Sequence, residues 1–180
     1  MKLVLVADRS HVKIHTFAEG LFSRLAHDLE LGCKGLSGSA ERTDDLRGSA
    51  SIDVPIRRID VNGTLKHGRV DLSGLSSSER ADVLEKMRRE VFHTNDGTVH
   101  VEATLVSEST ARVSVTPPKG RKVERSVSVK VASEDGDVRV SGALEVSLTA
   151  IGGGTVKGPM NAFRVKDGVA IHFDVVFVPA

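Results

Sequence analysis

The chain contains neither tryptophan nor tyrosine, and its only cysteine is Cys33. A single cysteine excludes an intramolecular disulfide, and a chain of 180 residues buries enough surface to fold without one. With six phenylalanines as the only large aromatic residues, there is little to stack on nucleic-acid bases. The net charge of +1 creates no strong overall field toward polyanions. The composition therefore predicts one globular domain with no nucleic-acid partner.

Long apolar runs are also missing. The segment Met1–Asp8 offers only about five apolar residues before a charge, too few for the core of a signal peptide and far too few for a membrane span. We therefore expect no transmembrane segment and a cytoplasmic location, with which a lone cysteine is compatible.

What the chain does contain is a repeated alternation of apolar and polar residues, as in Thr98–Leu105 and Val169–Phe177. Successive side chains of a strand point to opposite faces, so a period of two produces one apolar and one polar face. The pattern predicts a mainly β, antiparallel fold. Further strands or strand–turn segments are predicted at residues 10–17, 28–34, 36–41, 48–54 and 65–72.

One segment breaks this rhythm. Ser76 and Glu79 have the Ser-x-x-Glu spacing of a helix capping box. An apolar stripe follows at helical spacing, which predicts one amphipathic helix from Ser77 to Phe92, packed across the sheet or over an open barrel end. The stripe consists of Val83, Leu84, Met87 and Val91. The outward face of the helix carries Arg80, Glu85, Lys86, Arg88 and Arg89. A shorter helical turn is expected from Gly20 to Ala26.

About eight strands and one helix suit two architectures. A sandwich hides the apolar faces between two sheets and leaves no cavity, whereas a closed barrel has room for one small ligand. Both have the same period of two, so the alternation does not separate them.

Several short segments resemble the YceI family of lipocalin-like proteins, and together they extend over nearly the whole chain. They are the opening strand Arg9–Phe17, His27–Leu31, Leu36–Gly38, Leu75–Val83 before the helix, Val140–Val146, and Lys157–Gly158 with Val165–Val169. The resemblance implies a single lipocalin-like antiparallel β-barrel domain over residues 1–180, often dimeric, that holds a polyisoprenoid or the tail of an isoprenoid quinone. The expected partner is thus a hydrophobic small molecule, and a homodimer is compatible with it. Many relatives are periplasmic, unlike the location expected here.

The apolar positions of the strands would form an aliphatic lumen wall if they face inward. Such a wall suits a branched alkyl or prenyl chain, because each buried methylene contributes about 0.8 kcal/mol. The strand positions expected to contact a ligand are Val12, Ile14, Leu29, Leu31, Val101, Leu105, Val129, Val146, Ile171, Phe173 and Val175. The same faces carry Ala103, Val113, Val115, Val127, Val140, Leu144 and Phe177. From the residues alone a solid core is favoured, because aliphatic alternation builds one in most β-proteins. The resemblance shifts the expectation to an open lumen.

Seven histidines are the natural candidates for chemistry. His11 and His15 share a strand face but lie roughly 13 Å apart at about 3.3 Å per residue, too far to ligate one metal ion together. His27 could touch a ligand head group at the barrel mouth or bond to the backbone in its corner. His93, His100 and His172 would converge only through the fold. No nucleophile elbow, zinc-protease, Walker or paired-carboxylate motif is present, so no catalytic residue, metal or cofactor is predicted.

Two basic groups remain, one on the helix and one at residues 119–125. Either could bind the phosphate of a lipid head group or an acidic partner. Acidic neighbours balance the positive charge of both groups, which favours the interpretation that each group is an ordinary solvated face.

The sequence thus predicts a non-catalytic protein that binds, carries or sequesters an elongated isoprenoid-type lipid. Two alternatives stay open: a quinone-linked enzyme or redox accessory protein that uses His27, and a ligand-free interaction module with a filled core. Glycines at 152–154 and 158 predict a mobile gate over residues 151–161, with Phe163 near the lumen behind it, because glycine neither packs a side chain nor restricts the backbone.

Overall fold

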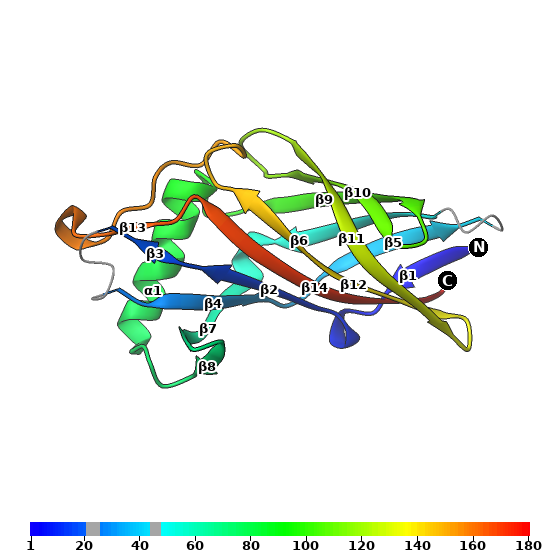
Figure 1. Ribbon diagram of the computed structural model, residues 1–180, viewed down its shortest axis with the longest axis horizontal. Helices are drawn as coiled ribbons and strands as arrows, with labels where there is room; N and C mark the ends of the chain where they lie inside the picture. Colours follow the sequence, from blue (N-terminus) through cyan, green and yellow to red (C-terminus); the bar gives the residue numbers. More distant parts are fainter. Residues whose placement is uncertain (21–25, 44–47) are drawn as a thin grey trace.

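The computed structural model describes residues 1–20, 26–43 and 48–180, so most of the predicted helical turn from Gly20 to Ala26 lies outside the described residues. The described part is mainly antiparallel β-structure with one long helical segment (Figure 1). The strands are β1 (Lys2–Leu5), β2 (His11–Thr16), β3 (Ala18–Glu19), β4 (Asp28–Cys33), β5 (Ser37–Arg42), β6 (Gly48–Pro55), β7 (Ile59–Lys66), β8 (Arg69–Asp71), β9 (Thr98–Ser107), β10 (Thr110–Thr116), β11 (Val123–Glu134), β12 (Asp137–Ser147), β13 (Arg164–Val165) and β14 (Gly168–Pro179). The helical segments are η1 (Ala7–Arg9), η3 (Ile56–Arg58), α1 (Ser77–Lys86), η4 (Met87–Val91) and η5 (Pro159–Asn161).

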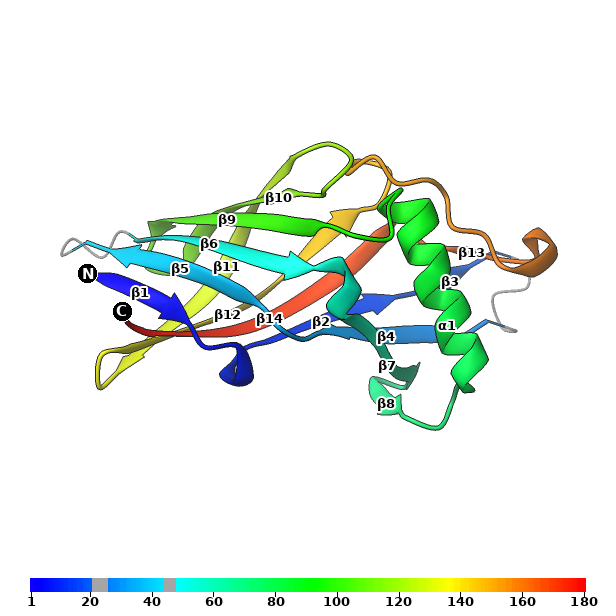
Figure 2. The ribbon, with the colours of Figure 1, turned by 180° about the vertical axis from the view of Figure 1, so that it is seen from behind.

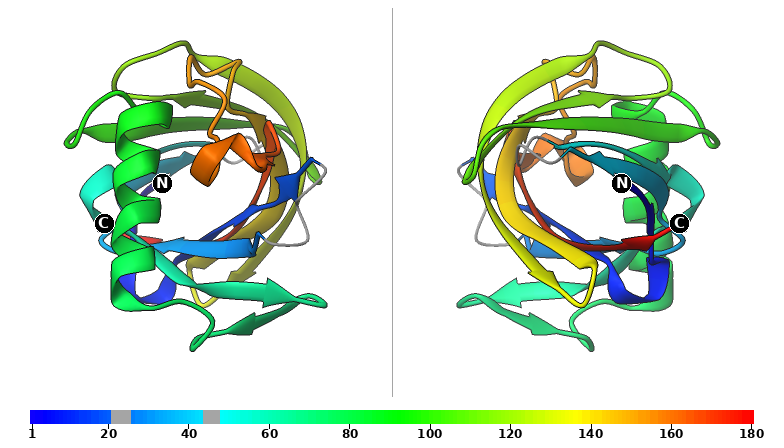
Figure 3. Two further views of the ribbon diagram at one scale, coloured as in Figure 1. Left: turned by 90° about the vertical axis from the view of Figure 1, so that its left-hand side faces the viewer. Right: turned by 90° about the vertical axis from the view of Figure 1, so that its right-hand side faces the viewer.

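Eight strands close into a ring at the end of the molecule where both termini lie, which we call the terminal end (Figures 1 and 3). Their order is β1-β5-β6-β9-β10-β11-β12-β14, and β14 returns to β1 with Leu5 opposite Phe177. Closure pairs the edge strands with each other, which removes the exposed sheet edges of a sandwich. The mainly β prediction is confirmed, and the choice between sandwich and barrel is settled in favour of the barrel.

Three long strands are each interrupted, and the interruptions widen the barrel toward its other end. The segments β1 and β2 both run beside β14, on either side of η1. In the same way β5 and β6 pair at the terminal end, while β4 and β7 pair beyond Leu36 and η3. Strand β9 begins opposite Pro55, the last residue of β6, so it pairs with β6 but not with β7. A gap in the strand wall is left between β7 and β9.

The segment α1–η4 lies across this gap and gives the second end, the helix end, its remaining wall (Figures 2 and 3). The predicted capping box is present: the Glu79 N–H donates to Ser76 Oγ at 3.3 Å, and the Ser76 N–H donates to Glu79 Oε2 at 2.8 Å. The last five residues, Met87–Val91, are π-helical, so the segment ends one residue before the predicted Phe92. The apolar stripe faces the barrel interior, as expected for a helix over an open barrel end.

Arg80 does not lie on a solvated helix face, which corrects the expectation for it. Its guanidinium donates to the carbonyl oxygens of Val61, Asn62 and Leu72. It therefore ties the start of α1 to β7 and to the end of the β7–β8 hairpin.

The predicted strand-turn segment 65–72 is a hairpin whose turn is His67–Gly68, where both residues have positive φ. In the twelve-stranded sheet, β1 and most of β7 were not predicted. In β7 the register shifts opposite Glu30 and Leu31, which places Asn62 and Gly63 out of alternation and hides the period of two. Among the described residues, no helix is long and apolar enough to cross a membrane.

Candidate ligand-binding cavity

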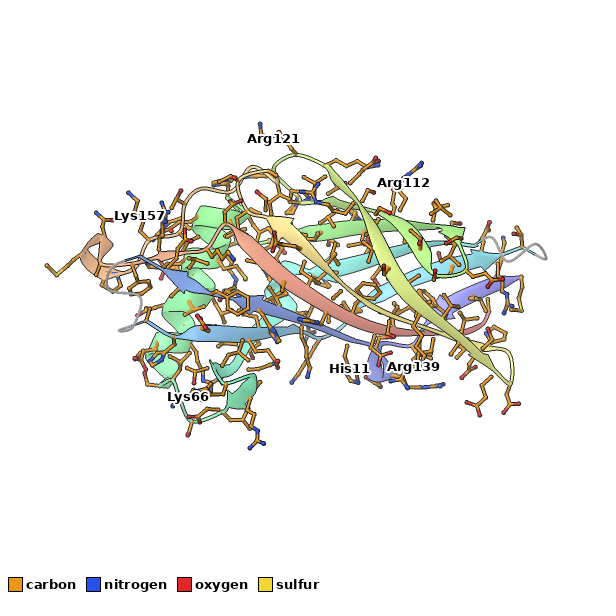
Figure 4. All side chains as sticks on the ribbon, in the orientation of Figure 1. His11, Lys66, Arg112, Arg121, Arg139 and Lys157 are labelled. Carbon is orange, nitrogen blue, oxygen red and sulfur yellow. The ribbon has the colours of Figure 1, made fainter. Side chains whose placement is uncertain are left out.

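A cavity of about 670 Å³ lies inside the barrel. Its wall includes Leu3 and Arg42 at the terminal end and Met87 and Phe163 at the helix end, so it follows the long axis of the molecule. Residues from all eight strands of the ring line it. In Figure 4 the labelled side chains of Lys66 and Arg121 point away from the barrel. The size falls within the usual range of small-molecule sites. The described part of the chain therefore has an open lumen and not a filled core.

The predicted ligand-contact residues all lie on the cavity wall. They are Val12, Ile14, His27, Leu29, Leu31, Val101, Leu105, Val129, Val146, Phe163, Ile171, Phe173 and Val175. Their common inward direction follows from the strand period, since Leu31, Ile14 and Ile171 lie opposite one another across β4, β2 and β14 and share one face. Val127, predicted on the same faces, is buried in the core but is not part of the cavity wall.

The helical stripe supplies wall residues that the strand alternation did not indicate. Val83, Met87 and Val91 line the cavity where β7 and β9 separate. Their spacing in the sequence predicted a helix packed across the sheet or over an open barrel end, and the second placement is the one that makes them part of the wall. Ile52 and Ile59, which flank η3, also line it.

Polar wall residues are concentrated at the two ends. At the helix end they are Thr16, His27, Glu79, Asp82, Lys86 and Lys157, and we call the opening that they border the mouth. Lys86 Nζ donates to the carbonyl oxygen of Lys157, which joins α1 to the loop before β13. Hydrogen bonds from the backbone and hydroxyl of Ser76, with a smaller effect of His27, lower the pKa of the Glu79 carboxyl. Glu79 is thus a fixed anion at the mouth.

The terminal end is crossed by a side chain. Arg42 of β5 donates from Nη1 to Ser133 Oγ of β11 at 3.0 Å. In the closed ring β5 and β11 lie on opposite sides, so this bond spans the barrel. The lumen is therefore bounded by a guanidinium at this end and opens at the mouth at the other.

Histidines outside the lumen have other partners. His15 Nε2 lies 2.9 Å from Glu30 Oε2, and its ring centroid lies 4.7 Å from that of His172. Asn62 Nδ2 donates to Glu30 Oε1 at 2.8 Å. Burial raises the pKa of the Glu30 carboxyl, but the hydrogen bonds from Asn62 and His15 and the charge of Lys13 outweigh it, so the pKa lies below its ordinary value.

The remaining histidines do not gather into a reactive site. His100 Nδ1 lies 2.6 Å from Asp53 Oδ1, and the His93 ring contacts the carbonyl oxygens of Arg89 and Gly152. Across residues 1–20, 26–43 and 48–180, no group of three or more His, Cys, Asp or Glu side chains is arranged to hold a metal ion.

The glycines at 152–154 are held by backbone hydrogen bonds and do not form a flexible hinge. This corrects the reason for predicting a mobile gate over residues 151–161. The Gly153 N–H donates to the Leu148 carbonyl and the Gly154 N–H to the Glu90 carbonyl, each at 2.8 Å. A Cβ on Gly153 would lie 2.8 Å from the Leu148 oxygen. Glycine is needed at position 153 because backbones approach closely, and hydrogen bonds join the run to η4 and to Leu148, the residue after β12.

An eight-stranded antiparallel barrel with an enclosed, mostly aliphatic lumen defines the class of cavity-bearing, lipocalin-like barrels. Two solved structures share this fold: BcnA from Burkholderia cenocepacia and a polyisoprenoid binding domain from Saccharophagus degradans implicated in plant cell wall breakdown. The first aligns with a TM-score of 0.65 and 18% identity over 96% of this chain and 98% of BcnA. The second aligns with a TM-score of 0.60 and 9% identity over 99% of this chain and 98% of that domain.

The fold is therefore YceI-like, as the sequence resemblance predicted. No protein-family model and no curated protein matches the sequence.

Proposed function

We propose that this protein binds one elongated isoprenoid-type lipid, or the tail of an isoprenoid quinone, in its lumen and carries or sequesters it without chemical change. The observation that carries the proposal is the cavity of about 670 Å³ that follows the barrel axis. The Saccharophagus degradans protein, a polyisoprenoid binding domain with the same fold, supports this ligand class.

The chemistry of the wall favours a branched hydrocarbon. Between the two ends the wall is built from valine, leucine, isoleucine, alanine and phenylalanine side chains, which offer dispersion contacts but few hydrogen-bond partners. A polar substrate would lose its hydration in this region without compensation. The polar groups at the mouth are placed to face a head group while the tail occupies the lumen.

A non-catalytic role fits the same geometry. His27 is exposed at the mouth, and no other described residue forms a hydrogen bond to its imidazole. General-base catalysis needs a base that is oriented toward the proton it removes. We therefore assign His27 to head-group contact. Quinone chemistry at His27 is the competing hypothesis, and the experiment below distinguishes the two.

Native mass spectrometry tests the proposal after incubation with a polyprenol or a ubiquinone. A complex of one protein and one lipid is expected for the natural chain. Phe173→Asp and Val129→Asp should abolish it, because each places a charge against the lipid tail. Phe173→Leu should retain it, and His27→Ala should only weaken it. Absence of any complex, or quinone turnover that His27→Ala removes while binding persists, would overturn the proposal.

A further inference from the structure

The loop beside the mouth has a combination of features that lipid binding inside the lumen does not explain. We define the mouth loop as residues 157–166, which connect the glycine run to β14. Lys157, Gly158, Pro159 and Phe163 line the cavity. Met160, at the centre of the loop, is 99% exposed, more than any other large apolar residue of the described chain. A single exposed apolar residue is ordinary on a protein surface. Met160 differs in its nearly complete exposure directly beside the mouth.

The backbone holds Met160 in this exposed position. Met160 and Asn161 have φ of 53° and 56°, the left-handed region that side chains other than glycine rarely adopt. Hydrogen bonds close the loop: the Gly158 N–H donates to the Phe163 carbonyl at 2.8 Å, and the Ala162 N–H donates to the Pro159 carbonyl at 3.1 Å. Gly158 also packs against the Phe163 ring, where a Cβ would lie 2.4 Å from the ring. Met160 is therefore presented by a built turn.

The base of the loop is anchored to the barrel. Arg164 and Val165 form β13, which pairs with β3, and the Lys166 N–H donates to the Phe17 carbonyl at 2.7 Å. In Figures 1 and 2 the loop extends beyond the strands at the helix end, and the end-on view in Figure 3 places it at the side of that opening, across from α1. A partner that contacts Met160 therefore also faces the mouth.

The charges of the loop are of one sign. The mouth loop carries Lys157, Arg164 and Lys166 and no acidic residue, although the net charge of the whole chain is only +1. Arg164 pairs with Glu19 at 2.6 Å. Lys157 and Lys166 are exposed, and no ion pair of either is found among the described residues. Each lysine near an anionic lipid surface adds electrostatic attraction, and an apolar side chain exposed between the two can enter the lipid interface.

We infer that the mouth loop docks on an anionic lipid bilayer, with Met160 entering the interface and Lys157 and Lys166 facing the lipid head groups. This inference rests on the proposed function, because a lumen that takes up an apolar tail must obtain it from a lipid phase. Docking through the mouth loop turns the mouth toward the bilayer, so that a tail passes into the lumen without crossing water.

Fluorescence tests the inference, because the chain has no tryptophan or tyrosine of its own. Met160→Trp places the only indole at the tip of the loop. Its emission should shift to the blue with vesicles of phosphatidylcholine and phosphatidylserine, and less with phosphatidylcholine alone. Val106→Trp is the matched control, since Val106 is 55% exposed on β9 at the terminal end, and its emission should not shift. Equal shifts at both positions, or none at position 160, would overturn the inference.

Vesicle sedimentation with the unlabelled chain supplies a second measurement. Met160→Ser should lower the partition coefficient about tenfold, and Lys166→Glu should lower it at least about fivefold at low salt. Val106→Ser and Lys130→Glu, exposed positions away from the mouth loop, should leave it unchanged. A partition coefficient that none of the four variants alters would contradict docking through this loop.

Lipid delivered in detergent separates this inference from the proposed function. Met160→Ser should bind a polyprenol from detergent as the natural chain does and take it up more slowly from anionic vesicles. If the natural chain binds lipid from detergent but does not associate with vesicles, only the docking inference fails. If it associates with vesicles through Met160 but binds no polyprenol, only the proposed function fails.

Discussion

Gly142 of β12 stands directly opposite Phe173 of β14, and a Cβ on Gly142 would lie 2.8 Å from Phe173 Cζ. The same Cβ would lie 2.8 Å from the carbonyl oxygen of Ser128 on β11. The missing side chain of Gly142 thus leaves the space into which the Phe173 ring folds against the lumen wall. This pairing explains why a glycine lies within a central strand, where it would otherwise weaken the sheet.

Gly142→Ala should therefore destabilise the protein by about 1–3 kcal/mol, because the Phe173 ring and the β11 backbone must both move. Urea unfolding followed by far-UV circular dichroism measures the change. Gly154→Ala is the matched control, since its Cβ would find only ordinary contact at 3.6 Å and should change stability by less than about 0.5 kcal/mol. Equal effects of the two substitutions would show that the Gly142–Phe173 contact is not tight.

Ala50→Phe should fill the terminal half of the lumen. Ala50 of β6 lies opposite Ala40 of β5, and both line the cavity, so a larger ring has empty space to enter. We expect polyprenol binding to fall at least about tenfold, with an unfolding free energy within about 1 kcal/mol of the natural chain. Ala143→Phe, on the exposed face of β12, should leave binding unchanged. Unaltered binding by Ala50→Phe would place the lipid elsewhere.

Glu30 should contribute stability that depends on pH. Its pKa is lowered in the folded state relative to the ordinary value of 4.5, so its contribution is complete above about pH 4.5 and is lost as the pH falls through the folded-state pKa. Glu30→Gln should cost roughly 1–3 kcal/mol at neutral pH and make the acid-induced loss of stability shallower. Denaturant unfolding at a series of pH values measures both effects. Glu145→Gln, at an exposed site, should reproduce neither of them.

Cys33 should react slowly with thiol reagents in the folded protein. The side chain is 7% exposed, and burial raises the pKa of its thiol to about 11, so little thiolate forms near neutral pH. Labelling with a chromogenic disulfide reagent should be slow in buffer and fast in denaturant, with one thiol titrated per chain. Rapid labelling of the native protein would mean that β4 opens readily.

Gly153→Pro should destabilise the junction between η4 and β12 by more than about 1 kcal/mol. Proline removes the N–H that donates to Leu148 at 2.8 Å and adds atoms where a Cβ alone would approach Val91 Cα to 3.3 Å. Thermal unfolding measures the loss. A neutral or stabilising result would restore the view that the glycine run is a free hinge.

Local patterns in the sequence determined the inward faces, the capped helix and most turns. A strand alternates its side chains whatever its partners, so Val12, Ile14 and Phe173 could be assigned to one face before their neighbours were known. The capping box of Ser76 and Glu79 is likewise a contact between residues three apart. Where the local period failed, as at the register shift in β7, the strand was missed.

The residue pattern left open whether these faces surround a lumen. The family resemblance implied that they do, and the tertiary structure decided it. Closure depends on pairing Leu5 with Phe177 from opposite ends of the chain, and no local pattern reports such a pairing. The same holds for Arg42, which meets Ser133 across the ring, and for Gly142, whose role depends on a ring from another strand. An aliphatic face packs equally well in a sandwich core or around a cavity, because the hydrophobic effect has no direction. The number of strands in the ring, and the helix that completes its wall, set the space that remains inside.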